Sequence, residues 1–288
     1  MFVKGSAMKR MILLLAGLLT CLQLVETAPA RAAEMTLFVL NVGKADCMLL
    51  RSGESSYLID TGRGNTFDRV EKALSGLSVS YLDGVIITHT DSDHVGGLKK
   101  LLKSGIEVGK IYTSAFYLPE KKEDRENPVT KAAGKRDVPV GFLRGGDSLP
   151  LDGGSLRVLG PLRAAEDKED NNSVVLLAQA AGGSILLAGD MEFPEESDLL
   201  SAGVIPEADV LKIANHGDGD ATSEALINAV RPGTTVISTS TEEKADTPAK
   251  RVLRLLETWN VDVWQTQNAG TGILVTLRDG EVSVEAVP

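Results

Sequence analysis

The sequence predicts an α/β fold in which two β-sheets pack face to face with helices on the outside. Two strand-rich halves have helical segments between them, and such halves bury the apolar faces of their sheets against each other and against amphipathic helices. Hydrophobic residues make up 43% of the 288 residues and aromatic residues only 4%, which suits β-rich packing of Val, Leu and Ile. Three predicted strands also end in residue types that bind metal ions.

The first half begins with a strand meander, because apolar and polar residues alternate there and Ser52-Gly53-Glu54 forms a tight turn. Apolar residues then recur at helical spacing on either side of a short buried strand. We expect strands at 36–42, 47–51, 56–60 and 84–88, and helices at 67–77 and 95–103.

The second half repeats this alternation of strands and helices, with no sequence repeat at a fixed period. Its apolar runs and turn residues place two helices between parallel-type strands and a third before the final strands. We expect strands at 155–159, 174–179, 184–187, 209–214, 234–238, 261–265, 272–277 and 282–286, and helices at 194–202, 223–230 and 248–259.

Residues 1–32 resemble an export signal peptide, with the true start at Met1 or at Met8. The basic pair Lys9-Arg10 precedes an apolar run over 11–25, which is too short for a comfortable membrane span. Thr20 before Cys21 is a poor fit to a lipidation signal, so we do not expect a lipoprotein. We expect a protein that is secreted, periplasmic or on the cell surface, with residues 33–288 as a single domain that has no stable membrane span.

Four potential metal ligands follow the predicted strand 84–88 within six residues: His89, Asp91, Asp93 and His94. Alternate residues leaving a strand end point to one side, and the Gly-Gly pair that follows lets the last imidazole turn back toward them. Neutral imidazole and ionised carboxylate are the ligands that divalent cations need. The pattern therefore predicts a metal site, and a solvated polar turn is the poorer interpretation.

Two other predicted strands end in the same residue types, at Asp190 after strand 184–187 and at His216 after strand 209–214. Together the three strand ends supply three imidazoles and three carboxylates, enough for two cations that share one carboxylate. Two cations a few ångströms apart polarise an ester and generate hydroxide from water. The sequence thus predicts a two-metal hydrolase.

These motifs, in this order, resemble the metallo-β-lactamase superfamily, whose fold is an αββα sandwich of two mixed β-sheets with helices outside. More narrowly, the chain resembles the extracellular β-lactamase-like domain of ComEC competence proteins and their secreted stand-alone relatives. The resemblance covers nearly all of the chain after the signal. The motifs that carry it are Val42-Gly43-Lys44-Ala45-Asp46, Asp60-Thr61-Gly62, His89-Thr90-Asp91-Ser92-Asp93-His94, Asn171-Asn172-Ser173, Gly189-Asp190 and Lys212 to Asp218.

The resemblance implies roles for individual residues. His89, Asp91 and Asp190 would hold one cation, whereas Asp93, His94, Asp190 and His216 would hold the second. Asp190 would bridge the two, Asp93 and Asp190 would be the catalytic residues, and a hydroxide between the two cations would attack phosphorus. Asn172, Lys212, Asn215 and Ser223 are candidates to contact substrate, although hydrogen bonding within a loop is an equal alternative for Asn172, Lys212 and Ser223.

The chain departs from the pattern of these relatives at several positions. Where the superfamily has its second His, this chain has Asp91, which either binds metal or only hydrogen-bonds His89. A carboxylate in place of an imidazole favours harder cations. We therefore expect two divalent ions, Zn²⁺ or Mn²⁺ with Mg²⁺ as a further option. The remaining departures, which bear on whether activity is retained, are Lys44-Ala45 for Gln-Gly, Asn215 for His, Asp218 for Ser and Thr247 for His.

Charge gives mixed indications about the substrate. The net charge of −10 argues against nucleic-acid binding through the fold as a whole. Residues 99–144, however, contain eleven basic and six acidic residues, so they are the candidate surface for DNA or another polyanion, with an ordinary solvated surface as the alternative.

We expect an exported hydrolase that is a phosphodiesterase or nuclease, with DNA and the competence or DNA-uptake machinery as candidate partners. Two alternatives remain. One is hydrolysis of another ester, such as a lactone, a thioester or a cell-wall phosphoester. The other is a metal-stabilised binding module that has lost its activity, an interpretation that rests on the departures at Asn215, Asp218 and Thr247.

Overall fold

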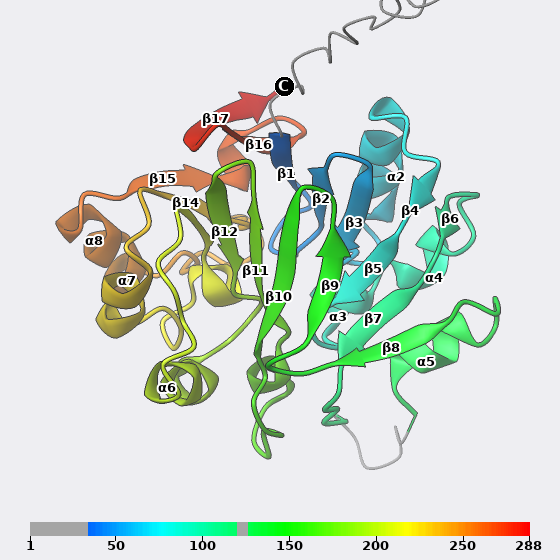
Figure 1. Cartoon of the computed structure of the whole chain (residues 1–288), viewed down its shortest axis with the longest axis horizontal. Helices are drawn as coiled ribbons and strands as arrows, with labels where there is room; N and C mark the ends of the chain where they lie inside the picture. Colours follow the sequence, from blue (N-terminus) through cyan, green and yellow to red (C-terminus); the bar gives the residue numbers. More distant parts are fainter. Residues whose placement is uncertain (1–33, 120–125) are drawn as a thin grey trace, which may run out of the picture. The chain divides into compact units, whose positions relative to one another are not determined.

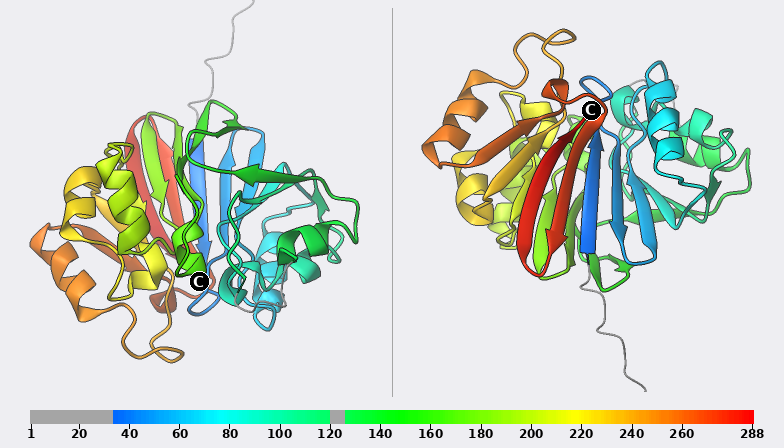
Figure 2. Two further views of the ribbon diagram at one scale, coloured as in Figure 1. Left: turned by 90° about the horizontal axis from the view of Figure 1, so that it is seen from below. Right: turned by 90° about the horizontal axis from the view of Figure 1, so that it is seen from above.

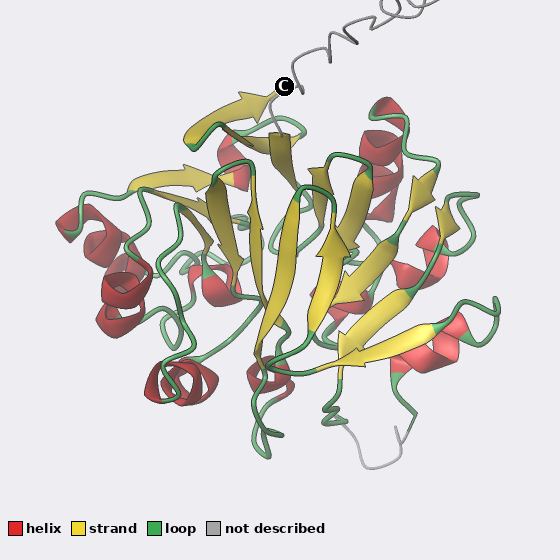
Figure 3. Ribbon diagram, viewed as in Figure 1, coloured by secondary structure: helices red, strands yellow, loops and turns green. Residues whose placement is uncertain are grey.

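A computed structural model describes residues 34–119 and 126–288, and the predicted export signal lies outside the described residues. Two mixed sheets dominate the fold (Figures 1 and 3), as expected from the sequence. The first sheet has the strand order β17-β16-β1-β2-β3-β5-β7-β8. Its strands are β1 (Glu34–Leu40), β2 (Met48–Ser52), β3 (Ser55–Ile59), β5 (Gly84–Ile87), β7 (Ile111–Ser114), β8 (Val140–Leu143), β16 (Gly272–Arg278) and β17 (Glu281–Val287).

The second sheet has the order β15-β14-β13-β12-β11-β10-β9. In both sheets antiparallel pairs occupy one side, and parallel pairs, β3-β5-β7-β8 and β12-β13-β14-β15, occupy the other. The strands are β9 (Ser148–Leu151), β10 (Gly154–Gly160), β11 (Val175–Ala180), β12 (Gly183–Leu187), β13 (Val210–Lys212), β14 (Thr234–Ile237) and β15 (Asp262–Gln265), and a separate pair is formed by β4 (Tyr81–Leu82) and β6 (Glu107–Val108).

Helices cover the outer face of each sheet (Figure 2), which gives four layers in the order helix, sheet, sheet, helix. One apolar core lies between the sheets, where Leu37 and Met48 of the first pack in a cluster with Leu156 and Leu176 of the second. A further core lies under the helices on each side. The helices are α2 (Phe67–Gly76), α3 (Ser92–Val95), α4 (Leu98–Leu101), α5 (Pro128–Ala133), α6 (Phe193–Ser201), α7 (Glu224–Val230) and α8 (Lys250–Thr258), with 3₁₀ turns η1 (Glu169–Asn172), η2 (Ala214–Gly217) and η3 (Thr266–Asn268).

The prediction of one helix over 95–103 was wrong, because two short helices, α3 and α4, replace it. Gly96 and Gly97 lie between them and press against neighbouring backbone. A Cβ at Gly97 would overlap the carbonyl oxygen of Thr61, and a Cβ at Gly96 would overlap the carbonyl oxygen of Ser92. Close backbone approach, which only glycine permits, has therefore overridden the helical spacing.

The basic stretch 99–144 contains more regular structure than the sequence indicated, namely β6, β7, β8 and α5. Some of its charges are already paired: Lys100 lies 3.3 Å from Asp68, and Lys131 lies 3.4 Å from Glu126. Lys110 lies over the ring of Tyr112. Among the described residues, no helix has the length and apolar character needed to cross a membrane.

Candidate metal centre

The ligand-type residues come together at the carboxyl ends of three strands, β5, β12 and β13. The first four follow β5, Asp190 follows β12, and His216 follows β13, which pairs parallel with β12. The backbone N–H of Val174 donates to the carbonyl of Thr88 at 2.9 Å and so ties the end of β5 to the start of the second sheet's β11. Residues distant in sequence therefore meet at one edge of the sandwich, as the three strand ends predict.

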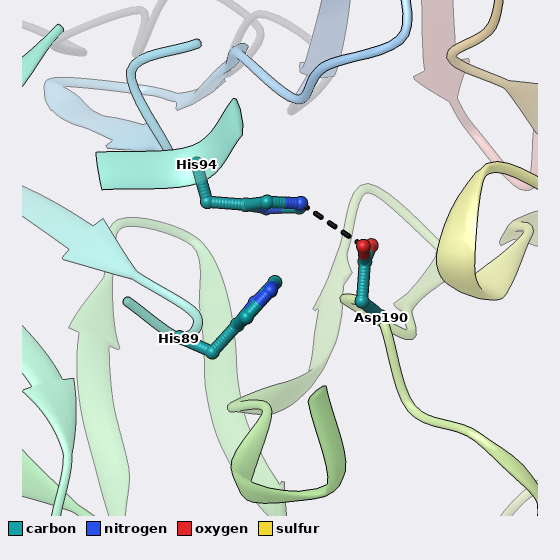
Figure 4. A group of neighbouring side chains, drawn as sticks. All are labelled: His89, His94 and Asp190. Carbon is teal, nitrogen blue, oxygen red and sulfur yellow. Dashed lines mark ion pairs between the residues drawn. The ribbon is translucent and has the colours of Figure 1, made fainter. Parts of the chain in front are cut away.

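Asp190 lies at the middle of the cluster. Its Oδ2 is 3.1 Å from Nε2 of His94 and 3.3 Å from Nε2 of His216, and Figure 4 shows it facing His94 with His89 beside them. Nε2 of His216 also lies 3.8 Å from Oδ2 of Asp93. The side chains of the three histidines are fully buried.

His89 forms the other end of the cluster. Its ring centroid is 4.1 Å from that of His94, and its Nε2 lies 3.5 Å from Oδ1 of Asp170. Ligand atoms of His89, Asp91 and Asp170 all lie within 4.8 Å of one another. Asp91 is thus placed with a potential ligand set and not only beside His89.

The Nδ1 atoms of the histidines are held by other groups, which turns each Nε2 toward Asp190 or its neighbours. Nδ1 of His94 lies 2.8 Å from Oδ2 of Asp60, whose carboxylate accepts from both the N–H and the hydroxyl of Thr88. Nδ1 of His216 lies 2.9 Å from the carbonyl of Ser238. Because a carbonyl only accepts, His216 carries its proton on Nδ1 and presents a free Nε2 lone pair when neutral.

The cluster contains buried nitrogen and oxygen atoms that are free to bind a cation. Within the described part of the chain, Nε2 of all three histidines, Oδ1 of Asp190 and Oδ1 of Asp46 are buried without a hydrogen-bond partner. Buried polar atoms in folded proteins are nearly always hydrogen-bonded or bound to an ion. Sets of ligand atoms within 4.8 Å of one another are His89-His94-Asp190, Asp93-His94-His216, Asp46-Asp190-His216, Asp46-Asp60-His94 and His89-Asp91-Asp170. These residues fit divalent metal ions in overlapping positions.

Electrostatic coupling within the cluster is strong. Burial alone would raise the pKa of Asp190, but His216 and His94 hold this pKa well below its usual range. Burial would likewise lower the pKa of His94, yet Asp190 and Asp60 on either side raise it well above the usual value. A metal ion at His94 would therefore have to displace a proton, so acid should weaken binding.

Around His89, at the other end of the cluster, the neighbouring charged groups are mainly carboxylates. Burial and the neighbouring His94 lower the pKa of His89, which favours the neutral imidazole that binds metal. Burial, together with Asp190 and Asp91, raises the pKa of Asp170 to about 8. Carboxylates this close repel one another, and a cation between them would remove the repulsion.

Comparison with known protein families decides the affiliation. Residues 40–241 match the Metallo-beta-lactamase superfamily. The chain belongs to the metallo-β-lactamase superfamily. The resemblance inferred from the motifs is thereby confirmed, together with the αββα fold.

Three named relatives align with this metallo-β-lactamase chain. ComE operon protein 3 of Bacillus subtilis is 28% identical over 84% of the chain, and Competence protein ComA of Neisseria gonorrhoeae is 25% identical over 90%. Ribonuclease TTHA0252 of Thermus thermophilus is 29% identical over 59%. The chain spans only 33%, 34% and 40% of the lengths of these three proteins, respectively.

A solved metallo-β-lactamase fold protein, YhfI of Bacillus subtilis, superimposes with a TM-score of 0.57. The alignment covers 85% of this chain and 99% of YhfI, at 13% sequence identity. At this identity the likeness concerns the fold alone.

All six predicted ligands of this metallo-β-lactamase domain lie in the cluster, but the four predicted substrate contacts do not form a substrate surface. Lys212 is fully buried, with Nζ 2.9 Å from Oδ2 of Asp46 and donating to the carbonyl of Ile213. Its role is a buried ion pair that joins the two sheets, because a charge so enclosed needs a counter-ion. Its predicted contact with substrate stays a prediction.

Asn172, Ser223 and Asn215 are likewise engaged with the protein. Asn172 is buried and accepts from the N–H of Ala165, and the hydroxyl of Ser223 accepts from the N–H of Leu226 as the cap of α7. These are the loop roles that the sequence left open as alternatives. Asn215 is buried beside His216 and donates to Glu192 at 3.3 Å.

Two acids near the centre, Asp218 and Asp220, lie beside lysines. Asp218 lies 2.7 Å from Nζ of Lys244 and accepts from the hydroxyl of Thr247. Asp220 lies 3.4 Å from Nζ of Lys168. Lys244 offsets the charge of Asp218, whereas Lys168 also lies 2.6 Å from Glu192 and is therefore shared between two carboxylates.

Sequence reasoning missed three carboxylates of the cluster: Asp46, Asp60 and Asp170. Asp46 and Asp60 lie in motifs that carried the resemblance, so their positions gave a signal without a role. Asp170 directly precedes the Asn171-Asn172-Ser173 element, and the resemblance gave a role to Asn172 but none to Asp170. The structure shows that Asp170 reaches His89 and that Asn172 turns away to hold a loop.

Proposed function

We propose that this protein is a metal-dependent phosphodiesterase that hydrolyses nucleic acid outside the cytoplasm. The observation that carries the proposal is the pair of overlapping ligand sets, His89-His94-Asp190 and Asp93-His94-His216, with buried nitrogens free to bind. When bound there, two divalent cations would polarise a phosphoester and lower the pKa of a bound water.

The chain's own residues position this chemistry. Asp190 faces both His94 and His216 and is the carboxylate best placed to be shared. Asp60 fixes the ring of His94, and Asp93 is held on the open side of the cluster by the guanidinium of Arg63 at 3.0 Å. Fixed carboxylates and imidazoles cost no reorganisation when charge develops on the substrate.

Nucleic acid as the substrate is supported by the relatives. A competence protein and a ribonuclease both align with most of this domain, and the named competence homologues suggest a role in DNA uptake. The competence relatives fit an extracellular or membrane-associated setting, in agreement with the predicted signal peptide. A partnership with uptake machinery belongs to this proposal.

The experiment strips the domain of metal, reloads it with Zn²⁺, Mn²⁺ or Mg²⁺, and measures hydrolysis of bis(p-nitrophenyl) phosphate and of single- and double-stranded DNA. We expect metal-dependent turnover that Asp190→Asn lowers by at least about 100-fold, because a shared ligand is lost. Asp198→Asn is the matched control, since Asp198 pairs with Arg163 on the surface.

Absence of turnover with every metal and both phosphodiesters would overturn the proposal. A parallel screen of lactones and thioesters then separates a hydrolase of another ester from a binding module. For a binding module, Asp190→Asn would change thermal stability in the presence of metal while no substrate of the screen is turned over.

A further inference from the structure

Two cations lie beside Asp93 on the side of the cluster that reaches solvent. Nη2 of Arg63 is 3.0 Å and Nζ of Lys44 is 3.7 Å from Oδ2 of Asp93. Arg63 also donates to the carbonyl of Lys44 at 3.1 Å, so the two residues form one unit. Their side chains are 33% and 13% exposed, which leaves the guanidinium within reach of a ligand.

A carboxylate from a distant loop already occupies this unit. Oε2 of Glu243, from the loop between β14 and α8, accepts from the backbone N–H of Lys44 at 3.2 Å and lies 3.9 Å from Nε of Arg63. Nε of Arg63 is one of the buried atoms that, within the described ranges, lack a hydrogen-bond partner. Glu243 therefore satisfies only some of the hydrogen-bond donors that Lys44 and Arg63 present.

Gly43 makes this approach possible. Its φ is +86°, and a Cβ at this position would overlap the carboxylate of Glu243. A glycine in this conformation exposes the following backbone N–H to an anion, as in other backbone anion sites. The sequence Gly43-Lys44 therefore supplies a backbone donor, an ammonium and, through Arg63, a guanidinium at one point.

We propose that Lys44 and Arg63 form a subsite for a second phosphate of a nucleic-acid strand, next to the metal centre, and that Glu243 fills this subsite when substrate is absent. The proposal rests on the proposed function and adds where the strand lies. Asp93 belongs both to a ligand set of the centre and to the contacts of Arg63, so the subsite adjoins the scissile position.

Charge supports an anion as the occupant. Arg63 and Lys44 are balanced here by Asp93 and Glu243. A cation bound by Asp93 would share that carboxylate's charge, which leaves the guanidinium facing Glu243 alone. Glu243 is 41% exposed, and exposed ion pairs are weak, so a phosphate that binds the guanidinium through two oxygens can displace it.

Kinetics with two substrates test the subsite, because bis(p-nitrophenyl) phosphate has one phosphate and a short oligothymidylate has several. We expect Lys44→Met to raise KM for the oligothymidylate by about fivefold to tenfold more than it raises KM for bis(p-nitrophenyl) phosphate. Lys72→Met, on the exposed face of α2, is the control for loss of a cation. Equal changes for both substrates would overturn the proposal.

Glu243→Gln tests the competing carboxylate. It should lower KM for the oligothymidylate by about twofold to fivefold with little change in kcat, because one exposed ion-pair partner is removed. Glu242→Gln makes the same change in net charge at the adjacent exposed residue. If the two variants gave equal KM values, Glu243 would not occupy a substrate position.

Equilibrium binding separates this proposal from the proposed function. Binding of fluorescein-labelled oligothymidylate to the Mn²⁺-loaded protein is measured over a range of salt, with Arg63→Gln included and Mn²⁺ affinity measured for each variant. Lys44→Met and Arg63→Gln should each reduce the slope of log Kd against log salt by about 0.7, when each variant is measured at a Mn²⁺ concentration that saturates its own centre. This result would support the subsite even without turnover, whereas an unchanged slope would overturn it even in an active phosphodiesterase.

Discussion

The two sides of the metal centre are built in different ways. His89, Asp91, Asp93 and His94, here called the N-terminal wall, come from a single loop after β5. Asp170, Asp190 and His216, here called the C-terminal wall, come from three separate loops of the second sheet's connections. The first wall is specified by residues close in sequence, and the second depends on correct packing of distant segments.

Backbone contacts hold the N-terminal wall. The N–H of Asp46 donates to the carbonyl of Asp93, the N–H of Thr61 to that of His94, and the N–H of Gly97 to that of Gly62. The C-terminal wall depends more on buried charged groups and on an unusual turn. Asn215 and His216 have φ values of 43° and 54°, in the left-handed region that favours glycine.

The largest expected effect comes from disturbing the backbone contacts of the N-terminal wall. Gly97→Ala places a Cβ against the carbonyl of Thr61, and we expect it to lower the free energy of unfolding by about 3 kcal/mol. Gly76→Ala is the matched control, since nothing lies within 4 Å of a Cβ there. Urea denaturation of both variants measures the difference, and similar midpoints would contradict this account of the wall.

The second prediction concerns a residue that orients a ligand of the N-terminal wall. Asp60→Asn removes one of the oxygens that accept from Thr88 and His94, so the imidazole loses its fixed orientation. We expect about 10- to 100-fold weaker metal binding by calorimetry. Asp83→Asn, which alters a carboxylate that accepts from the N–H of Ser56, should leave metal affinity unchanged. Equal losses in both variants would indicate a general effect on folding.

The third prediction distinguishes the walls by pH. Burial raises the pKa of Glu195, at the start of α6 behind the C-terminal wall, well above its usual value. The folded protein thus binds a proton that the unfolded chain releases above about pH 4.5, so the group destabilises the fold increasingly as pH rises. Glu195→Gln should therefore raise Tm at pH 8, which corresponds to an increase of about 1–2 kcal/mol in the free energy of unfolding. At pH 4 it should have little effect on Tm.

Thermal unfolding of metal-free protein at the two pH values measures this difference, with the exposed Glu224→Gln as control. A gain at pH 4 as large as that at pH 8 would show that the substitution acts through packing and not through charge.

The smallest expected effect is at the left-handed turn of the C-terminal wall. Asn215→Ala should lower the free energy of unfolding by about 1 kcal/mol, because a Cβ residue other than Asn or Asp is strained at positive φ. Asn215→Gly should differ from the wild type by a few tenths of a kcal/mol, since it removes the strain and also the bond to Glu192. Equal stabilities for the two variants would contradict this explanation.

The same contrast explains what the sequence could predict. The spacing of His89, Asp91, Asp93 and His94 after an apolar strand specified the N-terminal wall, because strand geometry alone places such side chains together. Asp170 was missed since its reach toward His89 depends on how η1 packs against β5. Lys212 was a candidate for substrate contact through the family motif over Lys212 to Asp218, and only the tertiary fold shows its partner Asp46.

The strand pattern predicted most strands of the two sheets, because alternation and apolar runs are local properties, but it did not predict β7, β8 or β9. The prediction of a helix over 95–103 was wrong because Gly96 and Gly97 lie close to the backbone at Gly64 and Thr61, respectively. Helical periodicity in the sequence does not reveal such contacts. Local chemistry therefore specified most of the elements and one half of the site, and long-range contacts specified the other half.

The ion pair between Lys212 and Asp46 joins residues that are 166 positions apart and entirely enclosed. During synthesis Asp46 emerges long before its partner, so the early half of the chain, if it folded alone, would have to enclose this acid without a counter-ion. Neither half is expected to assemble a metal-binding state alone, since an unpaired buried charge is strongly unfavourable. Metal capture would accordingly be a late event that reports completion of the whole sandwich, and fragments produced by truncation or proteolysis would leave metal in solution.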